Sequence, residues 1–225
     1  MKKFFIPAAV VNAIALVSLI LFVGIQIPAF SMWFYRWQFG LNDTYAVVNM
    51  YPQDLHEVTR HMILYMQGRV PDLQIMTFVG GAARDFFSPI EIRHMVDVYY
   101  LFHYGFMIQY AMIALFVGSL GFFLWRGRAF VSYLFRAWQI AASATFGLLA
   151  VLVTAIAVNW HRAFIIFHEI FFDNDYWWLD PREDLLINIV PYDFFIACSV
   201  FIGAFFVGGL VLLFLGSTLL LRRKK

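Results

Sequence analysis

Four long apolar runs limit what this chain can fold into. They cover approximately residues 4–27, 98–125, 130–158 and 194–221. Each is about 20 or more residues long, the length that crosses a hydrocarbon core of roughly 30 Å as a helix. The chain is 63% hydrophobic and only 13% charged, which excludes an ordinary soluble domain. The sequence therefore predicts an all-α membrane protein with four transmembrane helices, forming a single integral membrane domain over residues 1–225.

Positive charges flank the apolar runs on one side of the predicted membrane. With four crossings, the basic residues on this side are Lys2, Lys3, Arg126, Arg128, Arg136 and the terminal RRKK at 222–225. Because basic flanks stay in the cytoplasm, both termini are expected there. Every Asp and Glu falls on the other side, in residues 31–97 and 159–193. The basic residues follow the usual membrane pattern, so nucleic acid is not an expected partner.

The first outer segment is predicted to supply most of a small extracytoplasmic cap. Apolar residues recur about every 3.6 positions in residues 51–69, which predicts a surface helix that Gly68 stops. Residues 73–79 are typical of a strand, and Gly80 and Gly81 end it. The cap is therefore expected to contain short helices and a small β element.

The end of this segment carries the pattern of a capped helix. Ser88 is a typical cap, Pro89 suits the first helical position, and Glu91 stands three residues after the cap, as in a capping box. We expect the helix to continue into the second membrane span. His94 and Asp97 then lie at the outer boundary of that span.

One short stretch resembles half of a zinc-protease motif. His168 and Glu169 begin an HExxH pattern, but Phe172 stands where the second histidine ligand belongs. His161 lies seven residues before His168, about 10 Å along a helix, which is too far for both to bind one metal without help. A site built from His94, His168 and an aspartate remains an alternative that no spacing supports. We therefore expect neither a metal nor another cofactor.

General acid–base chemistry is the remaining catalytic option. The sequence has no G-x-S-x-G nucleophile elbow, and Ser88 is better explained as a helix cap than as a nucleophile. Two imidazoles, His94 and His168, are expected near the membrane surface with carboxylates close by. Asp97 follows His94 by one helical turn, so it either supports that ring or faces water.

A polar and aromatic cluster follows His168. Its polar members are Asn174, Asp175, Asp180 and Asp184. They have an ordinary interpretation as turn-forming and capping residues, and Asp180 before Pro181 is typical of the cap of a helix that begins PREDLLINIV. Trp177 and Trp178 are either membrane-interface anchors or a platform for substrate.

These residues carry a resemblance to a known family. The second outer segment resembles the bacterial lipoprotein intramolecular transacylase (Lit) family through Phe167-His168, Asn174-Asp175 with Trp177, Asp180-Pro181 with Asp184, Leu186-Ile187, and Pro191 with Phe194-Phe195. The first outer segment matches a second motif of the family, F-S-x-x-E-x-x-H-M-x-D-V, at residues 87–98. The two motifs are separate in the sequence, which makes chance agreement improbable.

The resemblance implies a reaction and its residues. Lit-type enzymes move the sn-2 acyl chain of a diacylglyceryl-cysteine lipoprotein onto the α-amino group of the same cysteine, giving a lyso-form lipoprotein. The functional histidines map onto His94 and His168, one expected to be the base and the other to donate a proton. Supporting or orienting residues are expected at Asp97, Asp175, Asn174 and Asp180, and substrate contacts at Trp177 and Phe167. Neither an acyl-enzyme intermediate nor a cofactor is expected, because the substrate supplies its own amine.

The same resemblance implies the partners of the protein and its location in the cell. The partners are diacylglyceryl-modified lipoproteins with an N-terminal cysteine, together with membrane lipids. The expected location is the bacterial plasma membrane, with several crossings and the active site at the outer leaflet. Two alternatives remain: a non-catalytic membrane protein whose outer cap binds lipid or a partner, and a metal-dependent membrane hydrolase.

Overall fold

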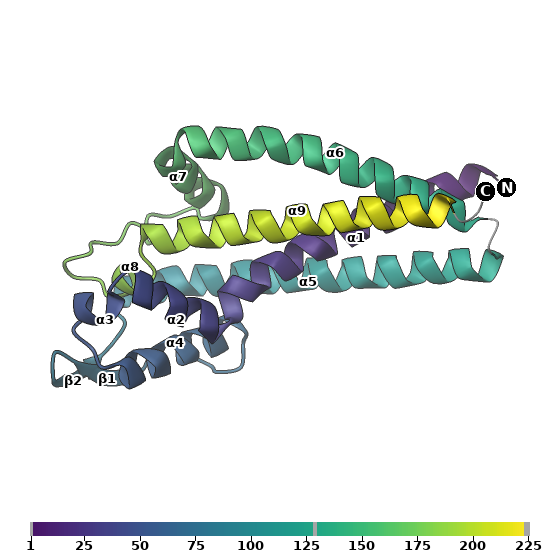
Figure 1. Cartoon of the computed structure of the whole chain (residues 1–225). Coiled ribbons are helices and arrows are strands. Elements are labelled where there is room, and N and C mark those ends of the chain that lie inside the picture. Colours follow the sequence, from purple (N-terminus) through teal and green to yellow (C-terminus); the bar gives the residue numbers. More distant parts are fainter. Residues whose placement is uncertain (1, 128–129, 223–225) are drawn as a thin grey trace. The chain divides into compact units, whose positions relative to one another are not determined.

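The computed structural model of the protein describes residues 2–127 and 130–222, and it is mostly helical (Figure 1). The helices are α1 (Lys2–Phe30), α2 (Met32–Leu41), α3 (Thr44–Val47), α4 (Pro52–Met66), α5 (Pro89–Arg126), α6 (Val131–Val158), α7 (Trp160–Phe171), α8 (Leu186–Ile189) and α9 (Tyr192–Arg222). The strands are β1 (Met76–Val79) and β2 (Ala82–Asp85). The predicted all-α fold with a small β element is confirmed. Of the basic residues used to predict orientation, Arg128 and residues 223–225 lie outside the described part of the chain.

Four of these helices, α1, α5, α6 and α9, are long and apolar enough to cross a membrane. The mean hydropathy of their most apolar windows ranges from 1.9 to 2.6. Helix α5 has 38 residues because the capped outer helix continues without a break into the second predicted span, as expected. The protein is therefore a multi-pass membrane protein.

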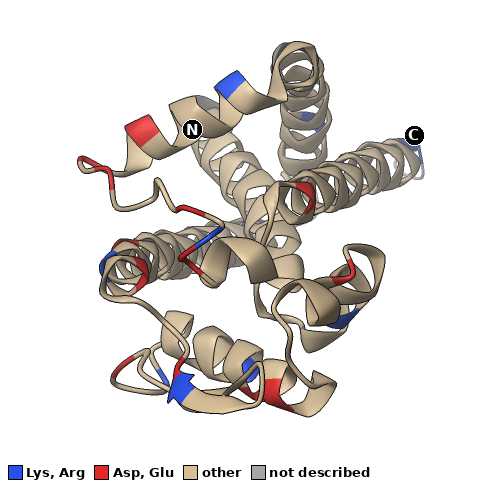
Figure 2. Ribbon diagram, turned by 90° about the vertical axis from the view of Figure 1, so that its left-hand side faces the viewer, with Lys and Arg blue, Asp and Glu red and all other residues tan. Residues whose placement is uncertain are grey.

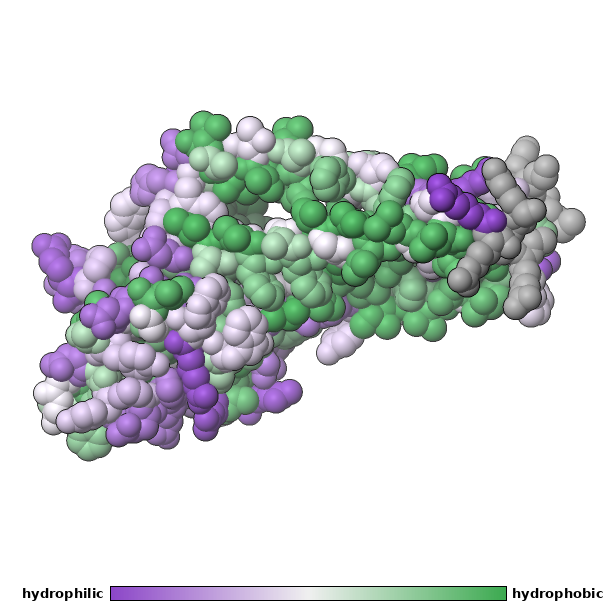
Figure 3. All heavy atoms as spheres, in the orientation of Figure 1, coloured by the Kyte–Doolittle hydropathy of each residue, from purple (hydrophilic) through white to green (hydrophobic). Residues whose placement is uncertain are grey.

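The chain packs into two compact units, each made of several stretches. Residues 1–24, 106–163 and 202–225 form the first unit, and residues 25–105 and 164–201 form the second. All 14 acidic residues fall in the second unit, where Figure 2 shows them in red on helices and loops. Hydrophobic side chains cover α5, α6 and α9 on the face shown in Figure 3. No observation tests the single domain expected from the sequence, which stays a prediction.

Buried polar groups join the helices of the first unit. The Asn12 side chain on α1 is fully buried. Its Nδ2 donates to Ser119 Oγ on α5 at 2.9 Å, and its Oδ1 accepts from Trp138 Nε1 on α6 at 2.9 Å. Gln139 Nε2 on α6 donates to Thr218 Oγ1 on α9 at 2.7 Å. Such bonds are favoured inside a bilayer because water is absent there to satisfy the polar groups.

The second unit has its own aromatic and aliphatic core. Helix α4 contributes Leu55, Val58 and Met62, all nearly or fully buried, which confirms the helical period expected for residues 51–69. The helix ends before Gly68, whose φ of +70° is a left-handed conformation that glycine adopts without strain. Its apolar face packs in one cluster with α2, α8 and the first turns of α5 and α9.

The β element is a single antiparallel hairpin. Met76 pairs with Asp85, and Val79 pairs with Ala82 across the turn. The two turn residues are Gly80 and Gly81, with φ of +60° and +81°. Positive φ at both central positions is the requirement of a two-residue turn of type I′, so the glycines that end the predicted strand also form the hairpin turn.

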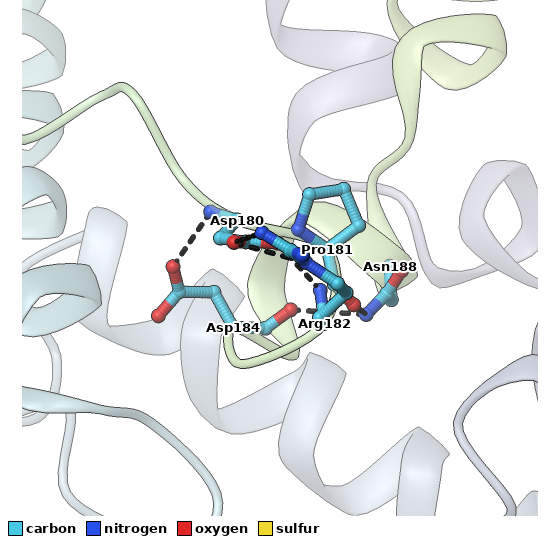
Figure 4. Close-up of polar contacts among 5 residues, drawn as sticks. All are labelled: Asp180, Pro181, Arg182, Asp184 and Asn188. Carbon is cyan, nitrogen blue, oxygen red and sulfur yellow. Dashed lines mark hydrogen bonds and ion pairs between the residues drawn. The ribbon is translucent and has the colours of Figure 1, made fainter.

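The segment before the last span differs from the prediction. Asp180 caps a single turn, because its Oδ1 accepts from the Arg182 N–H at 3.0 Å, and no helix begins at Pro181. Asn188 Nδ2 donates to the main-chain oxygens of Pro181 (2.7 Å) and Asp184 (3.0 Å), as Figure 4 shows. These side-chain bonds occupy carbonyls that a continuous helix would use, so the helical turn α8 begins only at Leu186. The expected helix over PREDLLINIV was wrong.

Candidate active site

The predicted capping box starts the helix that carries the first histidine. The Ser88 N–H donates to Glu91 Oε2 at 2.5 Å, and the Glu91 N–H donates to Ser88 Oγ at 3.4 Å. This reciprocal pair defines the first turn of α5. His94 lies one turn further along α5, and Asp97 one turn beyond His94.

Two buried carboxylates connect this turn to the second outer segment. Glu91 is fully buried, and its Oε1 accepts a short hydrogen bond from the Leu186 N–H. Asp184 is 6% exposed; its Oδ1 accepts from Ser88 Oγ and its Oδ2 from the Asp180 N–H, each at 2.9 Å. The two carboxylates thus bind main-chain N–H groups and a hydroxyl, which satisfies buried charge without a cation. The sequence indicated Glu91 and Asp184 only as capping and turn residues.

His168 lies on α7 with only 6% of its surface exposed. Its Nδ1 is 2.7 Å from the main-chain oxygen of Phe164, one turn earlier on the same helix. A carbonyl oxygen only accepts, so Nδ1 carries the proton. Nε2 is therefore the basic nitrogen whenever the ring is neutral.

Burial favours the neutral form of this ring. Desolvation lowers the pKa of His168 below its ordinary value, and the hydrogen bond to Phe164 opposes the shift without cancelling it. The imidazole is consequently neutral at pH 7 and can accept a proton at Nε2. Trp177 covers the ring at a centroid distance of 4.7 Å.

His94 faces His168, with 6.2 Å between the ring centroids. Phe172 packs edge-on against His94 at 5.3 Å. The Nδ1 atom of His94 is buried and has no hydrogen-bond partner among the described residues. Because buried polar atoms are nearly always paired, an unpartnered buried nitrogen marks this ring as a candidate for a functional role.

Asp97, one turn after His94 on α5, contacts the second outer segment. Asn174 Nδ2 donates to Asp97 Oδ2 at 2.9 Å, and Asn174 Oδ1 accepts from the Tyr176 N–H at 3.0 Å. The Arg93 guanidinium lies 5.6 Å from the centroid of the Tyr176 ring. The hydrogen bond of Asp97 thus comes from an amide in the segment after His168, and its support of the His94 ring stays a prediction.

The other predicted site residues divide into two groups. Phe167 lies 5.4 Å from the His168 ring, centroid to centroid, and is exposed, so it borders the histidine pair together with Trp177. Asp175 accepts the Trp178 N–H through its main-chain oxygen at 3.0 Å, which makes it a turn residue. Asp180 forms an ion pair with Arg182 at 2.6 Å, and the guanidinium lowers the pKa of this carboxyl to about 2. The structure brings neither Asp175 nor Asp180 into hydrogen-bond contact with a histidine.

The zinc-like pattern does not form a site in the structure. His161 and Glu169 are exposed on α7. Within residues 2–127 and 130–222, no three His, Cys, Asp or Glu side chains are grouped as metal ligands would be.

Comparisons with known proteins give the family and the fold. The profile of the family described as "Lipoprotein intramolecular transacylase Lit" matches residues 10–195. No curated protein sequence matches the chain. A solved structure of the membrane integral lipoprotein intramolecular transacylase Lit from Bacillus cereus is 20% identical, with a TM-score of 0.81 over 100% of this chain and 99% of that one.

Two further Bacillus cereus Lit structures, with one histidine replaced by arginine or by alanine, are also similar. Their TM-scores are 0.76 and 0.75 at 20% and 19% identity. They align with 99% of this chain and with 94% and 96% of their own chains. At this identity the likeness establishes the fold, and the profile match over residues 10–195 establishes the family. The chain therefore belongs to the lipoprotein intramolecular transacylase family, a family of membrane acyltransferases.

Proposed function

We propose that His94 and His168 carry out acid–base catalysis of the family's reaction on a diacylglyceryl-cysteine lipoprotein. The sn-2 acyl carbon forms a bond to the cysteine α-nitrogen, and its bond to the glycerol oxygen breaks. The nitrogen begins as an ammonium group with three protons and ends as an amide with one. Two protons must therefore leave it, one of which returns to the glycerol oxygen, and the other is released to water.

We assign the removal of one of these two protons to each imidazole. His94 has an unpartnered Nδ1, which takes the first proton and turns the ammonium into a nucleophilic amine. His168 has a basic Nε2, which takes the second proton from the attacking nitrogen and passes it to the leaving oxygen. The observation that carries the proposal is that two rings 6.2 Å apart each have a nitrogen without a hydrogen-bond partner among the described residues. No enzyme nucleophile is needed, so no acyl-enzyme forms.

The neighbouring residues support the two rings. Trp177 and Phe167 form an aromatic border beside His168 that suits acyl chains. Asn174 and Asp97 join the two outer segments next to His94. Asp180 and Asp175 shape the turns after His168, and we assign them no direct contact with substrate.

The proposed location is the bacterial plasma membrane, with both termini cytoplasmic and the site at the outer leaflet. Support for the orientation comes from the basic residues Lys2, Lys3, Arg126 and Arg136 at the ends of the spans, and all 14 acidic residues fall in the unit that contains both histidines. Lipid-modified substrates would reach this unit from the surrounding membrane, so membrane lipids are partners as well.

Single substitutions test the histidine roles. We expect His94→Ala and His168→Ala to lower the yield of N-acylated lyso-form cysteine by about a hundredfold or more, as acid–base groups do when removed. The readout is mass spectrometry of the N-terminal lipopeptide from a host that makes diacylglyceryl lipoproteins. His161→Ala is the matched control, because His161 is an exposed histidine on the same helix as His168.

The outcomes separate the alternatives. A product yield near wild type in either alanine variant, at equal expression, would show that the two-histidine mechanism is wrong. A non-catalytic protein predicts no product even from the wild type. A metal-dependent hydrolase predicts that a chelator removes activity and that it releases free fatty acid instead of amide.

A further inference from the structure

The side chains of Asp97 and Asn174 meet one helical turn from His94. We propose that they form a binding site for the α-ammonium group of the substrate cysteine, so that the enzyme selects lipoproteins with a free N-terminus. This inference rests on the proposed roles of His94 and His168, and it adds a ligand class, a primary ammonium group, to that site.

One oxygen of the Asp97 carboxylate has no hydrogen-bond partner among the described residues. It is half-buried, and among the described residues its only hydrogen bond comes from the neutral amide of Asn174, to Oδ2. A carboxylate accepts about four hydrogen bonds, so Oδ1 is open. Asp97 forms no ion pair with a described residue and therefore has no cationic partner there. A half-buried carboxylate in this state is complementary to a cation.

No charged side chain near Asp97 supplies the positive charge that its carboxylate could bind, so a ligand can supply it. Arg93 is one turn before Asp97 on α5, but its guanidinium lies over the Tyr176 ring and forms no ion pair with the carboxylate. Titratable groups on the neighbouring turns include Glu91 and His94 on α5, His168 on α7, and Asp173 and Asp175 on the loop after α7. Burial keeps His168 neutral at pH 7. None of these groups neutralises Asp97.

The spacing places an ammonium group within reach of the proposed base. Side chains three residues apart on a helix have Cβ atoms about 5–6 Å apart, a gap that one nitrogen can bridge. An ammonium group has three N–H donors: one can bond Asp97 Oδ1, and another can point at the unpartnered Nδ1 of His94. Asp97 would hold the charged form that dominates at neutral pH, and His94 would remove the proton that blocks attack.

The same contact distinguishes substrate from product. An opposite charge at about 4–6 Å raises the pKa of an amine by one unit or more, so the complex favours the ammonium form about tenfold. The product is an uncharged amide and forms no such contact. Asp97 would therefore select a free N-terminus on binding and weaken the hold on the N-acylated product.

A binding experiment tests this without turnover. The ligand is a short peptide whose N-terminal cysteine carries a glyceryl group with two ether-linked chains, which contains no acyl group to transfer. Its free-amine form is compared with its N-acetylated form, using the full-length protein in detergent micelles. We expect wild type to bind the free amine about tenfold more tightly, and D97N to bind both forms equally. D173N, which changes an exposed carboxylate on the loop after α7, should keep the wild-type ratio.

Two further readouts exclude a purely structural role for Asp97. The preference for the free amine should disappear as pH rises above about 8, where an α-amino group loses its proton, while binding of the N-acetyl form stays constant. With an ester substrate, D97N should raise KM more than it lowers kcat. A structural defect would weaken both ligands alike and lower kcat without this selectivity.

The outcomes are distinguishable from those for the histidines. If wild type binds the two forms equally, or if D97N keeps the tenfold ratio, the ammonium site is wrong even where His94→Ala and His168→Ala abolish product. If the histidine variants remain active, the proposed mechanism is wrong regardless of how D97N binds.

Discussion

At the scale of single residues, the site depends on how each histidine is hydrogen-bonded. The carbonyl of Phe164 holds the His168 proton on Nδ1, and burial keeps the ring neutral. His94 has no such restraint on its Nδ1. The proposed roles of the two rings differ accordingly, since His168 has a fixed tautomer and His94 has a nitrogen without a hydrogen-bond partner.

The neutral state of His168 predicts how activity depends on pH. The pKa of His168 is lower in the folded protein than in the unfolded chain, where it is about 6.5. We therefore expect the rate to stay high as pH falls to about 6.5 and to decline only below that value, when Nε2 becomes protonated. Initial rates of N-acyl product formation between pH 5 and 8 measure this.

The same shift has a consequence for stability. At pH values between the folded and unfolded pKa of His168, the unfolded chain binds more protons than the folded protein. The contribution of His168 to folding stability therefore rises with pH in that range and is constant above about 6.5.

The pH profile of the rate has a clear contradicting outcome. If the rate of N-acyl product formation falls to half as pH is lowered to about 7.5, the imidazole of His168 is not neutral at pH 7. The His161→Ala variant, which leaves the site unchanged, should reproduce the wild-type profile.

Local sequence patterns predicted that the two histidines belong to one site but did not predict the contacts of their neighbours. The two motifs indicated His94 and His168, and the structure places their rings side by side. The partner of Asp97 was not predictable, because helical spacing points to His94 whereas the hydrogen bond comes from Asn174, 77 residues away. Such a bond depends on the path of an irregular loop, which local sequence patterns do not determine.

At the scale of elements, Glu91 connects the start of α5 to the start of α8. One oxygen completes the capping box and the other binds the Leu186 N–H, so a single side chain fixes both the first turn of α5 and the loop. A capping box is a local pattern and was predicted from sequence. The contact with Leu186 is 95 residues away in the chain and was not.

Glu91→Gln should loosen this connection. Glutamine keeps the length of the side chain but replaces one accepting oxygen with a donor, so one main-chain N–H loses its partner. We expect a loss of about 1–3 kcal/mol in unfolding free energy, the cost of leaving one buried polar group unsatisfied. Thermal or denaturant unfolding in detergent measures the loss, and Glu57→Gln, on the exposed face of α4, serves as the control. Equal stability of the two variants would show that the carboxylate is not a structural link.

The turn before α8 shows where element prediction failed. Asp180-Pro181 is a good helix start by local propensity, yet Asn188 and Asp184 bind nearby main-chain groups and stop a helix from forming there. The small β element was predicted because β-forming residues end at Gly80 and Gly81, which is a purely local signal, and the two glycines form the hairpin turn with positive φ angles. Elements defined by local chemistry were therefore predictable, and those decided by side-chain competition were not.

At the scale of the whole molecule, hydrophobicity predicted the membrane helices, and the acidic residues occur in only one of the two units. The unit without acidic residues is held together by buried polar pairs such as Asn12–Ser119 and Gln139–Thr218, which suit an environment without water. The unit with all 14 acidic residues contains every residue proposed for catalysis. Membrane-spanning length and composition are strong sequence signals, so this level of organisation was predicted most completely.

The orientation of the chain in the membrane can be tested by labelling single cysteines. Cys198 is the only native cysteine, so a Cys198→Ser background carries no thiol. We expect a membrane-impermeant maleimide added to spheroplasts to label Asp173→Cys, because the loop after His168 should face outward. Arg126→Cys, at the last residue of α5, should react only after the membrane is permeabilised, because basic flanks remain in the cytoplasm. Labelling of Arg126→Cys alone in intact spheroplasts would reverse the proposed topology and place the histidine pair at the inner leaflet.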